Sequence, residues 1–226
     1  MGQVTILEET TKSPIALMGS RAGICWGSDI SNQEKNYKRG LDCLISGHGR
    51  VMEYVNVEMV LDGYSARVIR EWYTHISGAP TRLQASTRYV DYQQFSYVVP
   101  PAVAHNEEAR IRYEETMQKI SETCRYLEES CGIKREDAAL LLPLGMTTKI
   151  VDRRNLRSLV DMSRQRMCSR AYHEYREMFG DICGKLAEWS EEWAYLVEHF
   201  FMPKCEALGY CPEKRSCGRM PQKSGA

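Results

Sequence analysis

The segment from residue 51 to residue 61 alternates between apolar and polar side chains, and no other pattern in the chain constrains the fold as strongly. Its odd positions hold apolar residues at Val51, Val55, Val57, Met59 and Leu61. A repeat of two is typical of a strand with one buried face. Glu53 interrupts that face, and a carboxylate on a buried face needs a partner or a function. Glu53 is therefore a candidate site residue.

Longer segments around this strand repeat at the three- and four-residue spacing of helices. We expect helices over residues 31–46, 65–76, 106–132, 155–179 and 181–201, and a short helix after Arg135. We expect other strands over residues 3–8, 92–99 and 146–151, a turn at Asp62-Gly63 and a polar or extended segment over 81–89. These elements predict an α+β fold with a central mixed or antiparallel sheet, flanking helices and a helical C-terminal half. The simplest division is one domain over residues 1–203 and a cysteine-containing tail over 204–226.

Charge and composition exclude several classes of protein. The 226 residues contain 30 Lys and Arg and 30 Asp and Glu, so no global field attracts a nucleic-acid polymer or an anionic membrane. Apolar runs fall short of the ~20 residues of a membrane-spanning helix, and the N-terminus lacks the apolar core of a secretory signal. The nine cysteines fit reduced thiols better than a disulfide framework. We expect a cytoplasmic protein that binds neither nucleic-acid polymers nor membranes.

Local positive charge is concentrated after residue 152. Arginine recurs at Arg153, Arg154, Arg157, Arg164, Arg166, Arg170 and Arg176. Asn155 can cap a helix here, and Arg166 and Arg170 would stand one turn apart on it. Guanidinium groups beside a helix N-terminus suit an anionic ligand. A solvated basic face paired with acidic neighbours explains the same pattern equally well.

A second candidate anion site is the loop over residues 82–89, which holds two hydroxyls, an amide and two arginines. Such a loop can wrap a phosphate, although its composition is also that of an ordinary polar loop. No Gly-rich dinucleotide fingerprint or Walker loop occurs. His48 and Glu53 could reach one site or form a structural pair, and His75 could be a packed or capping residue.

Nucleophilic hydrolysis and metal binding have little support. No Cys-His or Ser-His-Asp arrangement follows from spacing. Cys205, Cys211 and Cys217 recur every six residues after His199, whereas structural zinc ligands usually pair two to four residues apart. We therefore predict no metal, and these three cysteines are the only metal candidates.

Taken in order, four motifs make the chain resemble the flavin-dependent thymidylate synthases from about residue 4 to residue 176. Residues 46–53, Ser-Gly-His-Gly-Arg-Val-Met-Glu, are similar to the family's Gly-His-x-x-x-x-Glu segment. Residues 85–89, Ala-Ser-Thr-Arg-Tyr, match its Ser-x-Arg-Tyr signature. Leu142-Pro143-Leu144 and the later 155–159 segment, Asn-Leu-Arg-Ser-Leu, match the motif that reaches FAD, and Arg166 takes the place of the pyrimidine-gripping arginine.

The resemblance implies an enzyme that reductively methylates dUMP to dTMP. FAD would carry the hydride, methylenetetrahydrofolate would donate the carbon, NADPH would be the reductant, and several subunits of a homotetramer would build each site. Arg166 would be catalytic. The residues implied to bind the nucleotide are Glu71, Thr74, Gln84, Ala85, Ser86, Thr87, Arg88 and Arg166. Those implied to bind flavin are His48, Arg50, Glu53, His75, Ile76, Gln84, Asn155, Arg157, Asp161 and Arg170.

The chain departs from the family at several of these positions. The family's Arg-His-Arg triplet aligns with Thr74-His75-Ile76, so both arginines are absent. Two extra residues, including Gly78 and Pro80, follow the triplet, and Glu71 replaces a nucleotide-contacting glutamine. Leu83-Gln84 stands for an Asn-Glu pair and Ala139 for an arginine, while Arg82 and Arg154 are candidates to restore the lost charge. Three alternatives follow: a divergent relative acting on another pyrimidine nucleotide, a flavin- or nucleotide-binding protein without catalysis, and a zinc-stabilised interaction protein.

Overall fold

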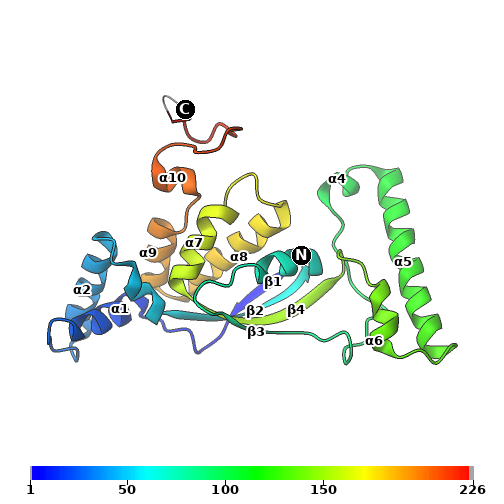
Figure 1. The fold of residues 1–226 in the computed structure, drawn as a ribbon, viewed down its shortest axis with the longest axis horizontal. Helices are drawn as coiled ribbons and strands as arrows, with labels where there is room; N and C mark the ends of the chain where they lie inside the picture. The colour runs from blue at the N-terminus through cyan, green and yellow to red at the C-terminus, as the bar shows by residue number, and fades with distance from the viewer. Residues whose placement is uncertain (1, 224–226) are drawn as a thin grey trace. The chain divides into compact units, whose positions relative to one another are not determined.

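A computed structural model describes residues 2–223, so Met1 and the last three residues of the predicted tail lie outside it. The strands are β1 (Gln3–Ile6), β2 (Asn56–Ser65), β3 (Thr81–Gln84) and β4 (Thr147–Asn155) (Figure 1). The helices are α1 (Pro14–Ile24), α2 (Gln33–Ile45), α3 (Ala66–Tyr73), α4 (Pro101–Ala104), α5 (Glu107–Glu129), α6 (Arg135–Ala138), α7 (Leu156–Arg166), α8 (His173–Trp189), α9 (Glu191–Phe200) and α10 (Lys204–Leu208). Two 3-10 helices, η1 (Gly49–Tyr54) and η2 (Ala139–Leu141), complete the set.

One four-stranded sheet has the order β1-β2-β4-β3, so its two central strands are far apart in sequence. Alternate residues of β2 are buried, as the period of two predicts: Val57, Met59 and Leu61 are fully inaccessible. β4 alternates in the same way, but its buried face ends in the charged residues Asp152 and Arg154. The predicted α+β class, with a sheet and flanking helices, is confirmed.

The described chain divides into two compact units. The first unit contains residues 2–3, 61–74 and 83–151. Its core gathers Phe95, Met117 of α5 and Met146, with partly buried tyrosines packed against them. Tyr113 donates a hydrogen bond of 3.0 Å from its hydroxyl to the Val98 carbonyl. Apolar contact and one satisfied hydroxyl therefore fix α5 within this unit.

The second unit contains residues 4–60, 75–82 and 152–223, and in it α1 packs closely on α2. The contact is made by backbone at two glycines. A Cβ placed on Gly19 would lie 1.8 Å from the Asn36 carbonyl oxygen, and one on Gly40 would lie 2.0 Å from that of Ile15. Only glycine permits this approach.

The N-terminus of α1 is capped from another helix. Its own N-cap residue, Ser13, makes no side-chain capping bond. Instead, a Glu192 carboxylate oxygen from α9 accepts the amides of Ile15 at 2.6 Å and Ala16 at 3.1 Å. The buried Trp193 indole donates to the Thr11 carbonyl at 2.7 Å just before α1 begins. These bonds tie α9 to the start of the chain.

Around Glu53 the prediction is wrong. Residues 49–54 form the 3-10 helix η1, and β2 begins only at Asn56. Met52, at an even position, is the buried residue of η1, and Glu53 is exposed. The predicted turn at Asp62-Gly63 is also wrong, because β2 continues to Ser65. Gly63 has a φ of 74° within the strand, a conformation that suits a bulge rather than a chain reversal.

The C-terminal helices are divided differently from the prediction. α7 ends at Arg166 and α8 runs from His173 to Trp189, so neither the helix over 155–179 nor that over 181–201 is correct. Ser190 begins α9 by accepting the Trp193 amide at 3.3 Å. Arg166 and Arg170 consequently do not share a helix, which corrects that part of the cationic-helix hypothesis.

The other predicted helices and strands agree with the structure only in part. Ser65, Asn106 and Asn155 cap α3, α5 and α7 as predicted, whereas α1 was not predicted at all. Of the predicted strand over 92–99, only Tyr97 bridges, to Met146. Within residues 2–223 no helix is both long enough and apolar enough to cross a membrane. The described part of the tail contains α10 and a bridge between Cys211 and Gln222, while the domain boundary at residue 203 stays a prediction.

Candidate active site

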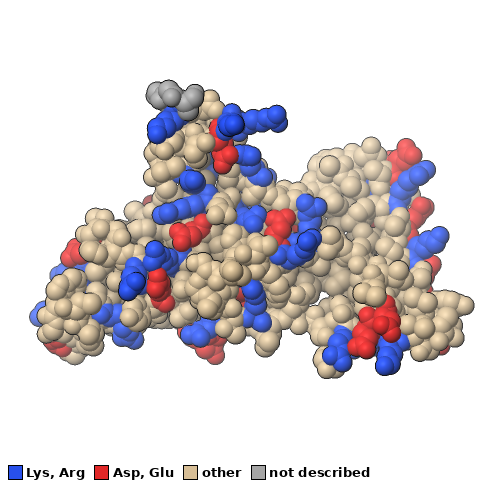
Figure 2. All heavy atoms as spheres, in the orientation of Figure 1, with Lys and Arg blue, Asp and Glu red and all other residues tan. Residues whose placement is uncertain are grey.

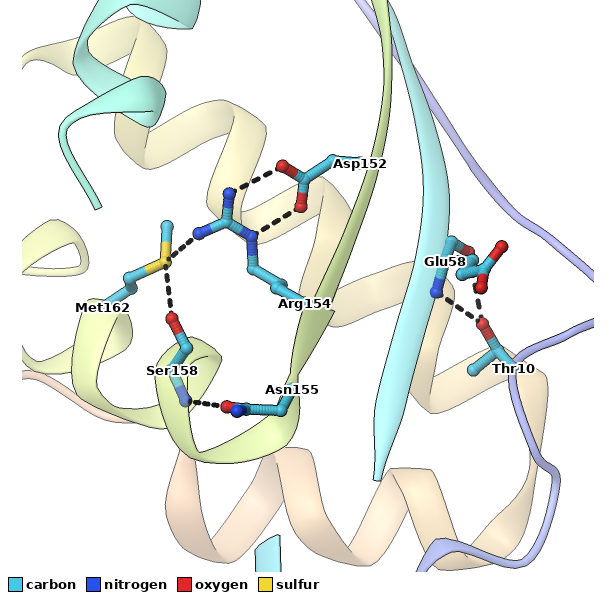
Figure 3. Close-up of polar contacts among 7 residues, drawn as sticks. All are labelled: Thr10, Glu58, Asp152, Arg154, Asn155, Ser158 and Met162. Carbon is cyan, nitrogen blue, oxygen red and sulfur yellow. Dashed lines mark hydrogen bonds and ion pairs between the residues drawn. The ribbon is translucent and has the colours of Figure 1, made fainter. Parts of the chain in front are cut away.

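The start of α7 is anchored by side chains from the end of β4 (Figure 3). The Asn155 side-chain oxygen accepts the Ser158 amide at 2.9 Å, which satisfies one of the orphan donors of the helix. Arg154 donates two bonds to the Asp152 carboxylate at 2.6 and 2.7 Å, and a third to the Met162 sulfur at 2.9 Å. Both charged side chains are fully buried. α7 is thereby held in a single orientation on β4.

At the other end of α7, Arg166 meets His75. The Arg166 Nε donates a hydrogen bond to the His75 Nε2 at 3.0 Å, and its guanidinium carbon lies 4.4 Å from the centre of the Tyr175 ring. The rings of His75 and Tyr175 are arranged edge to face, 6.3 Å apart. The structure therefore brings together the predicted catalytic arginine and the histidine retained from the family's triplet.

The protonation of His75 follows from its surroundings. Burial of the ring, followed by the positive charges of Arg166 and Arg154, lowers its pKa to about 4. The ring is then neutral near pH 7, so that its Nε2 can accept the Arg166 hydrogen bond and the ring proton resides on Nδ1. This arrangement holds a fixed guanidinium beside a neutral aromatic ring.

A second group of predicted flavin residues meets at η1. Arg157 of α7 donates to the Glu53 carboxylate at 2.6 Å, and both side chains are about half exposed. Gly49 approaches the same guanidinium, since a Cβ there would lie 3.9 Å from Arg157. His48 precedes η1 at its N-cap position. The partner of Glu53 is thus Arg157, rather than His48 as one reading of the sequence suggested.

The predicted phosphate loop over residues 82–89 begins within β3 and continues, from residue 85, as a tight turn in the first unit. The Ser86 carbonyl accepts the amides of Tyr89 at 3.1 Å and Val90 at 2.9 Å, and the Ser86 hydroxyl accepts the Arg88 amide at 3.2 Å. Arg88 itself pairs with Glu136 at 2.8 Å, with both side chains exposed. The Ser86 hydroxyl and Arg88 therefore lie on one turn, and both are group types that can bind a phosphate.

The residues that precede this turn are held by β4, and the other predicted nucleotide residues lie on α3 and at its C-terminal end. The Ala85 amide donates to the Lys149 carbonyl at 2.9 Å, and the Gln84 side-chain amide lies 3.4 Å from the Thr148 hydroxyl. On α3, Glu71 lies 3.9 Å from Arg67, and the Thr74 hydroxyl donates to the Glu71 carbonyl at 2.7 Å. Among the other predicted residues, Thr87 is partly buried, Ile76 is 71% exposed and Arg50 is exposed.

A hollow of about 930 Å³ lies against Arg166 in the second unit. The predicted flavin residues Asp161 and Arg170 line it together with the tail, and Arg170 forms an ion pair with Glu213. Cys205, Cys211 and Cys217 also line it; the first two are buried and Cys217 is exposed. Across residues 2–223 no three His, Cys, Asp or Glu side chains gather in a way that could hold a metal ion.

Sequence reasoning missed Asp152, Tyr175 and Glu213 as contributors to these contacts, and named Arg154 only as a source of charge. The Asp-x-Arg spacing on a strand places both side chains on one face, and this was the available signal that Asp152 and Arg154 pair with each other. Nothing in the tail signalled that Glu213 reaches Arg170. Figure 2 shows basic and acidic side chains interspersed over the viewed face, which fits charge that is organised locally.

Comparisons with known proteins agree with the motifs. A family model described as "Thymidylate synthase complementing protein" matches residues 6–191. The flavin-dependent thymidylate synthase of Nitratidesulfovibrio vulgaris is 33% identical over 208 residues, covering 87% of this chain and 82% of the relative. That of Clostridium tetani is 28% identical and covers 97% and 94% of the two chains.

A solved structure shares the fold. It is thymidylate synthase X from Helicobacter pylori with FAD and dUMP, which superposes with a TM-score of 0.66 at 20% identity over 89% of this chain and 99% of that one. The predictions of the family, the fold, the enzyme class and the flavin are confirmed by these matches. Since the family model spans most of the chain and the curated relatives agree with it, the chain belongs to the flavin-dependent thymidylate synthases.

Proposed function

We propose that the chain reductively methylates dUMP to dTMP, with methylenetetrahydrofolate as carbon donor, FAD as hydride carrier and NADPH as reductant. The observation that carries this proposal is the Arg166–His75 contact at 3.0 Å, because it holds the arginine that the motifs assign to the pyrimidine. The Helicobacter pylori relative was solved with FAD and dUMP. Most of the work of this protein is then positioning and electrostatics, and the organic chemistry belongs to the cofactors.

Arg166 fixes the pyrimidine ring. Its delocalised positive charge stabilises the negative charge that develops on the pyrimidine ring while C5 attacks the carbon donated by the folate. Because the guanidinium is already in place, it need not reorganise during the reaction. Contact with the Tyr175 ring and with His75 restricts the guanidinium before the nucleotide arrives. Ser86, Thr87 and Arg88 hold the phosphate, which competes with Glu136 for the Arg88 side chain.

The donors around η1 and α7 fit a flavin dinucleotide. FAD carries two phosphates, and Arg50 and Arg157 offer cations on η1 and α7, where Glu53 already orients Arg157. His48 and Asn155 add polar groups, and the glycine at position 49 leaves room beside Arg157. Bound FAD supplies the hydride; the residues of this chain bind it and orient it. Asp161, Arg170, Ile76 and Gln84 complete the proposed contacts.

A second candidate substrate is favoured by one residue. Glu71 stands where the family has a glutamine, and an ionised carboxylate can only accept hydrogen bonds, whereas an amide also donates. An amino group on the base would suit it, so dCMP is the alternative pyrimidine nucleotide. The loss of two triplet arginines similarly favours, as a third candidate, a flavin-binding protein without catalysis.

One experiment separates these candidates. Purified protein is mixed anaerobically with FAD, NADPH and methylenetetrahydrofolate plus either dUMP or dCMP, and the nucleotide is analysed by mass for one added methyl group. Methylated dUMP supports the main proposal, and methylated dCMP supports a divergent relative that acts on another pyrimidine nucleotide. If neither nucleotide is methylated but the protein keeps its yellow flavin absorbance, the result supports a flavin-binding protein without catalysis. Light scattering after gel filtration tests the proposed homotetramer, and the cytoplasmic location stays a prediction.

A further inference from the structure

The turn over residues 86–90 is hydrogen-bonded to the start of α6, a contact that the sequence analysis did not predict. Arg135 donates from its Nη1 to the Tyr89 carbonyl at 3.2 Å and from its Nε to the Glu128 carboxylate of α5 at 3.2 Å. All of these residues belong to the first unit. One arginine side chain therefore joins α5, α6 and this turn, which we call the 86–90 turn.

The ion pair between Arg135 and Glu128 is partly sheltered from water. The Glu128 side chain is 14% exposed and that of Arg135 is 35% exposed. Fully exposed ion pairs contribute little, because water and salt screen them and both side chains stay mobile. Here the planar guanidinium is held on two sides, by a carboxylate and by a backbone carbonyl, so it keeps one orientation. Its charge-assisted hydrogen bond to Tyr89 is therefore a fixed restraint on the turn.

The 86–90 turn is held at both ends by other parts of the first unit. Its own hydrogen bonds run from the amides of Tyr89 and Val90 to the Ser86 carbonyl. At its beginning the Ala85 amide donates to a β4 carbonyl at 2.9 Å, and near its end Arg135 binds the Tyr89 carbonyl. A binding loop that is already ordered loses less conformational entropy when its ligand arrives. Loss of the Arg135 bond would therefore weaken phosphate binding without removing a phosphate ligand.

Side chains from α5, α6 and the turn line a small hollow beside Arg135. Its volume is about 10 Å³, and Thr87, Glu128 and Ala139 are among its lining residues. That is roughly the space that one water molecule needs, so a phosphate does not fit there. Position 139 carries an arginine in the family, whereas here it is an alanine four residues after Arg135. Arg135 thus brings a cation to this hollow, where it contacts the backbone of the turn rather than a ligand.

We propose that Arg135, held by Glu128, is a positioning residue that keeps the 86–90 turn in the shape that presents Ser86 and Arg88 to the nucleotide phosphate. The proposal deepens the proposed function, since it rests on the phosphate contacts given there. Arg135 acts through the backbone of the turn and is not itself a phosphate ligand.

Hydrogen exchange in the ligand-free protein tests this positioning directly. Arg135→Met keeps a side chain of similar length but removes the charge and the donors. Arg110→Met is the matched control, because Arg110 also pairs with a glutamate of the first unit, but within α5 itself. Mass spectrometry should find that peptides covering the 86–90 turn exchange about threefold faster in Arg135→Met and at the natural rate in Arg110→Met. Equal rates in all three proteins overturn the proposal, as does an equal acceleration in peptides from β2, which would indicate general destabilisation.

A second variant keeps the test decisive if Arg135→Met does not fold. Glu128→Gln removes the carboxylate that holds the guanidinium and leaves every residue of the turn intact. Exchange of the 86–90 turn should again be faster than in the natural chain, and an unchanged rate contradicts the proposal.

Steady-state kinetics give the functional consequence. In Arg135→Met the KM for dUMP should rise about fivefold, the effect of roughly one lost hydrogen bond, while kcat stays within about twofold, because phosphate contacts are made equally in the ground and transition states. A merely structural role would lower the apparent kcat and leave KM unchanged. Glu136→Gln, at the next residue, should change KM in the opposite direction, because it frees Arg88. An unchanged KM beside a loosened turn overturns the proposal.

The two readouts separate this proposal from the proposed function. Exchange of the ligand-free turn needs neither nucleotide nor turnover. Absence of dTMP with the natural chain therefore refutes the proposed function, while the exchange rate of the 86–90 turn judges the effect of Arg135 independently.

Discussion

Replacing Gly78 by alanine should destabilise the protein through Asn155, the cap of α7. Gly78 has a φ of 74°, and a Cβ there would lie 2.3 Å from the Asn155 Nδ2 and 3.1 Å from its Oδ1. The Asn155 side chain cannot simply move aside, because it is buried and its oxygen accepts the Ser158 amide at 2.9 Å. The added methyl group must therefore displace the cap.

The magnitude has two parts. A left-handed φ destabilises an alanine by about 1–2 kcal/mol. Replacing glycine also lowers the conformational entropy of the unfolded chain, which offsets roughly 0.4–1 kcal/mol of this loss. Loss of an N-cap costs about 1 kcal/mol more. We expect Gly78→Ala to lower the free energy of unfolding by about 2 kcal/mol, measured by urea denaturation followed by circular dichroism.

Gly47→Ala is the matched control. Gly47 has a φ of 76°, and a Cβ there would meet nothing within 4 Å, so it reports backbone strain alone, about 1 kcal/mol or less. Asn155→Gly should cost only a few tenths of a kcal/mol, because glycine is an acceptable N-cap. The double variant Gly78→Ala/Asn155→Gly should then be more stable than the two single effects predict, by about 1 kcal/mol. Equal losses for Gly78→Ala and Gly47→Ala would refute the reasoning.

Three other predictions concern charge. Arg88→Ala should weaken dUMP binding at least tenfold, by about 1.5–3 kcal/mol, and Glu136→Gln should strengthen it by freeing Arg88; calorimetry decides both. Because the pKa of His75 is lowered to about 4 in the folded chain, the unfolded chain binds more protons below pH 6.5. The free energy of unfolding should therefore drop as the pH falls from 6.5 to 4, by about 1 kcal/mol at pH 5 after solvent screening. The variant His75→Gln should show a smaller drop over the same range. Burial raises the pKa of Cys183 to about 12 and hydrogen bonding lowers that of exposed Cys217, so iodoacetamide should label Cys217 first, as peptide mass mapping would show.

Local signals in the sequence identified the capped helices. Ser65, Asn106 and Asn155 each accept the amide three residues ahead, and this short-range chemistry is visible without the rest of the fold. α1 also has a local start signal, Ser13 followed by Pro14 at the first helical position, which the sequence analysis missed. Its capping bonds could not be read locally, because they come from Glu192, far away along the chain. The end of α7 at Arg166 was missed for a related reason: apolar spacing continues past it, and the turn is set by tertiary packing.

The sequence predicted which residues belong to the candidate site better than it predicted which side chains contact one another. Motif order placed Arg166 and His75 in one site, and the structure brings them to 3.0 Å. Period-two reasoning put Glu53 on a buried strand face, yet it pairs with Arg157 on the surface, because the chain makes a 3-10 turn before β2 begins. The charge of Arg154 could be suspected from sequence, whereas its burial against Asp152 could not, because a charged pair on a strand usually faces solvent.

The contact between α1 and α2 restricts how this chain can change over time. Gly19 and Gly40 face the backbone of the opposite helix at distances that exclude any side chain, so enlarging either residue forces the two helices apart. Such a separation would expose the buried residues between them, and one larger residue elsewhere cannot compensate for it. Homologous chains that keep this helical hairpin should therefore carry glycine at both positions together or at neither, a joint inheritance that an alignment of close relatives would reveal.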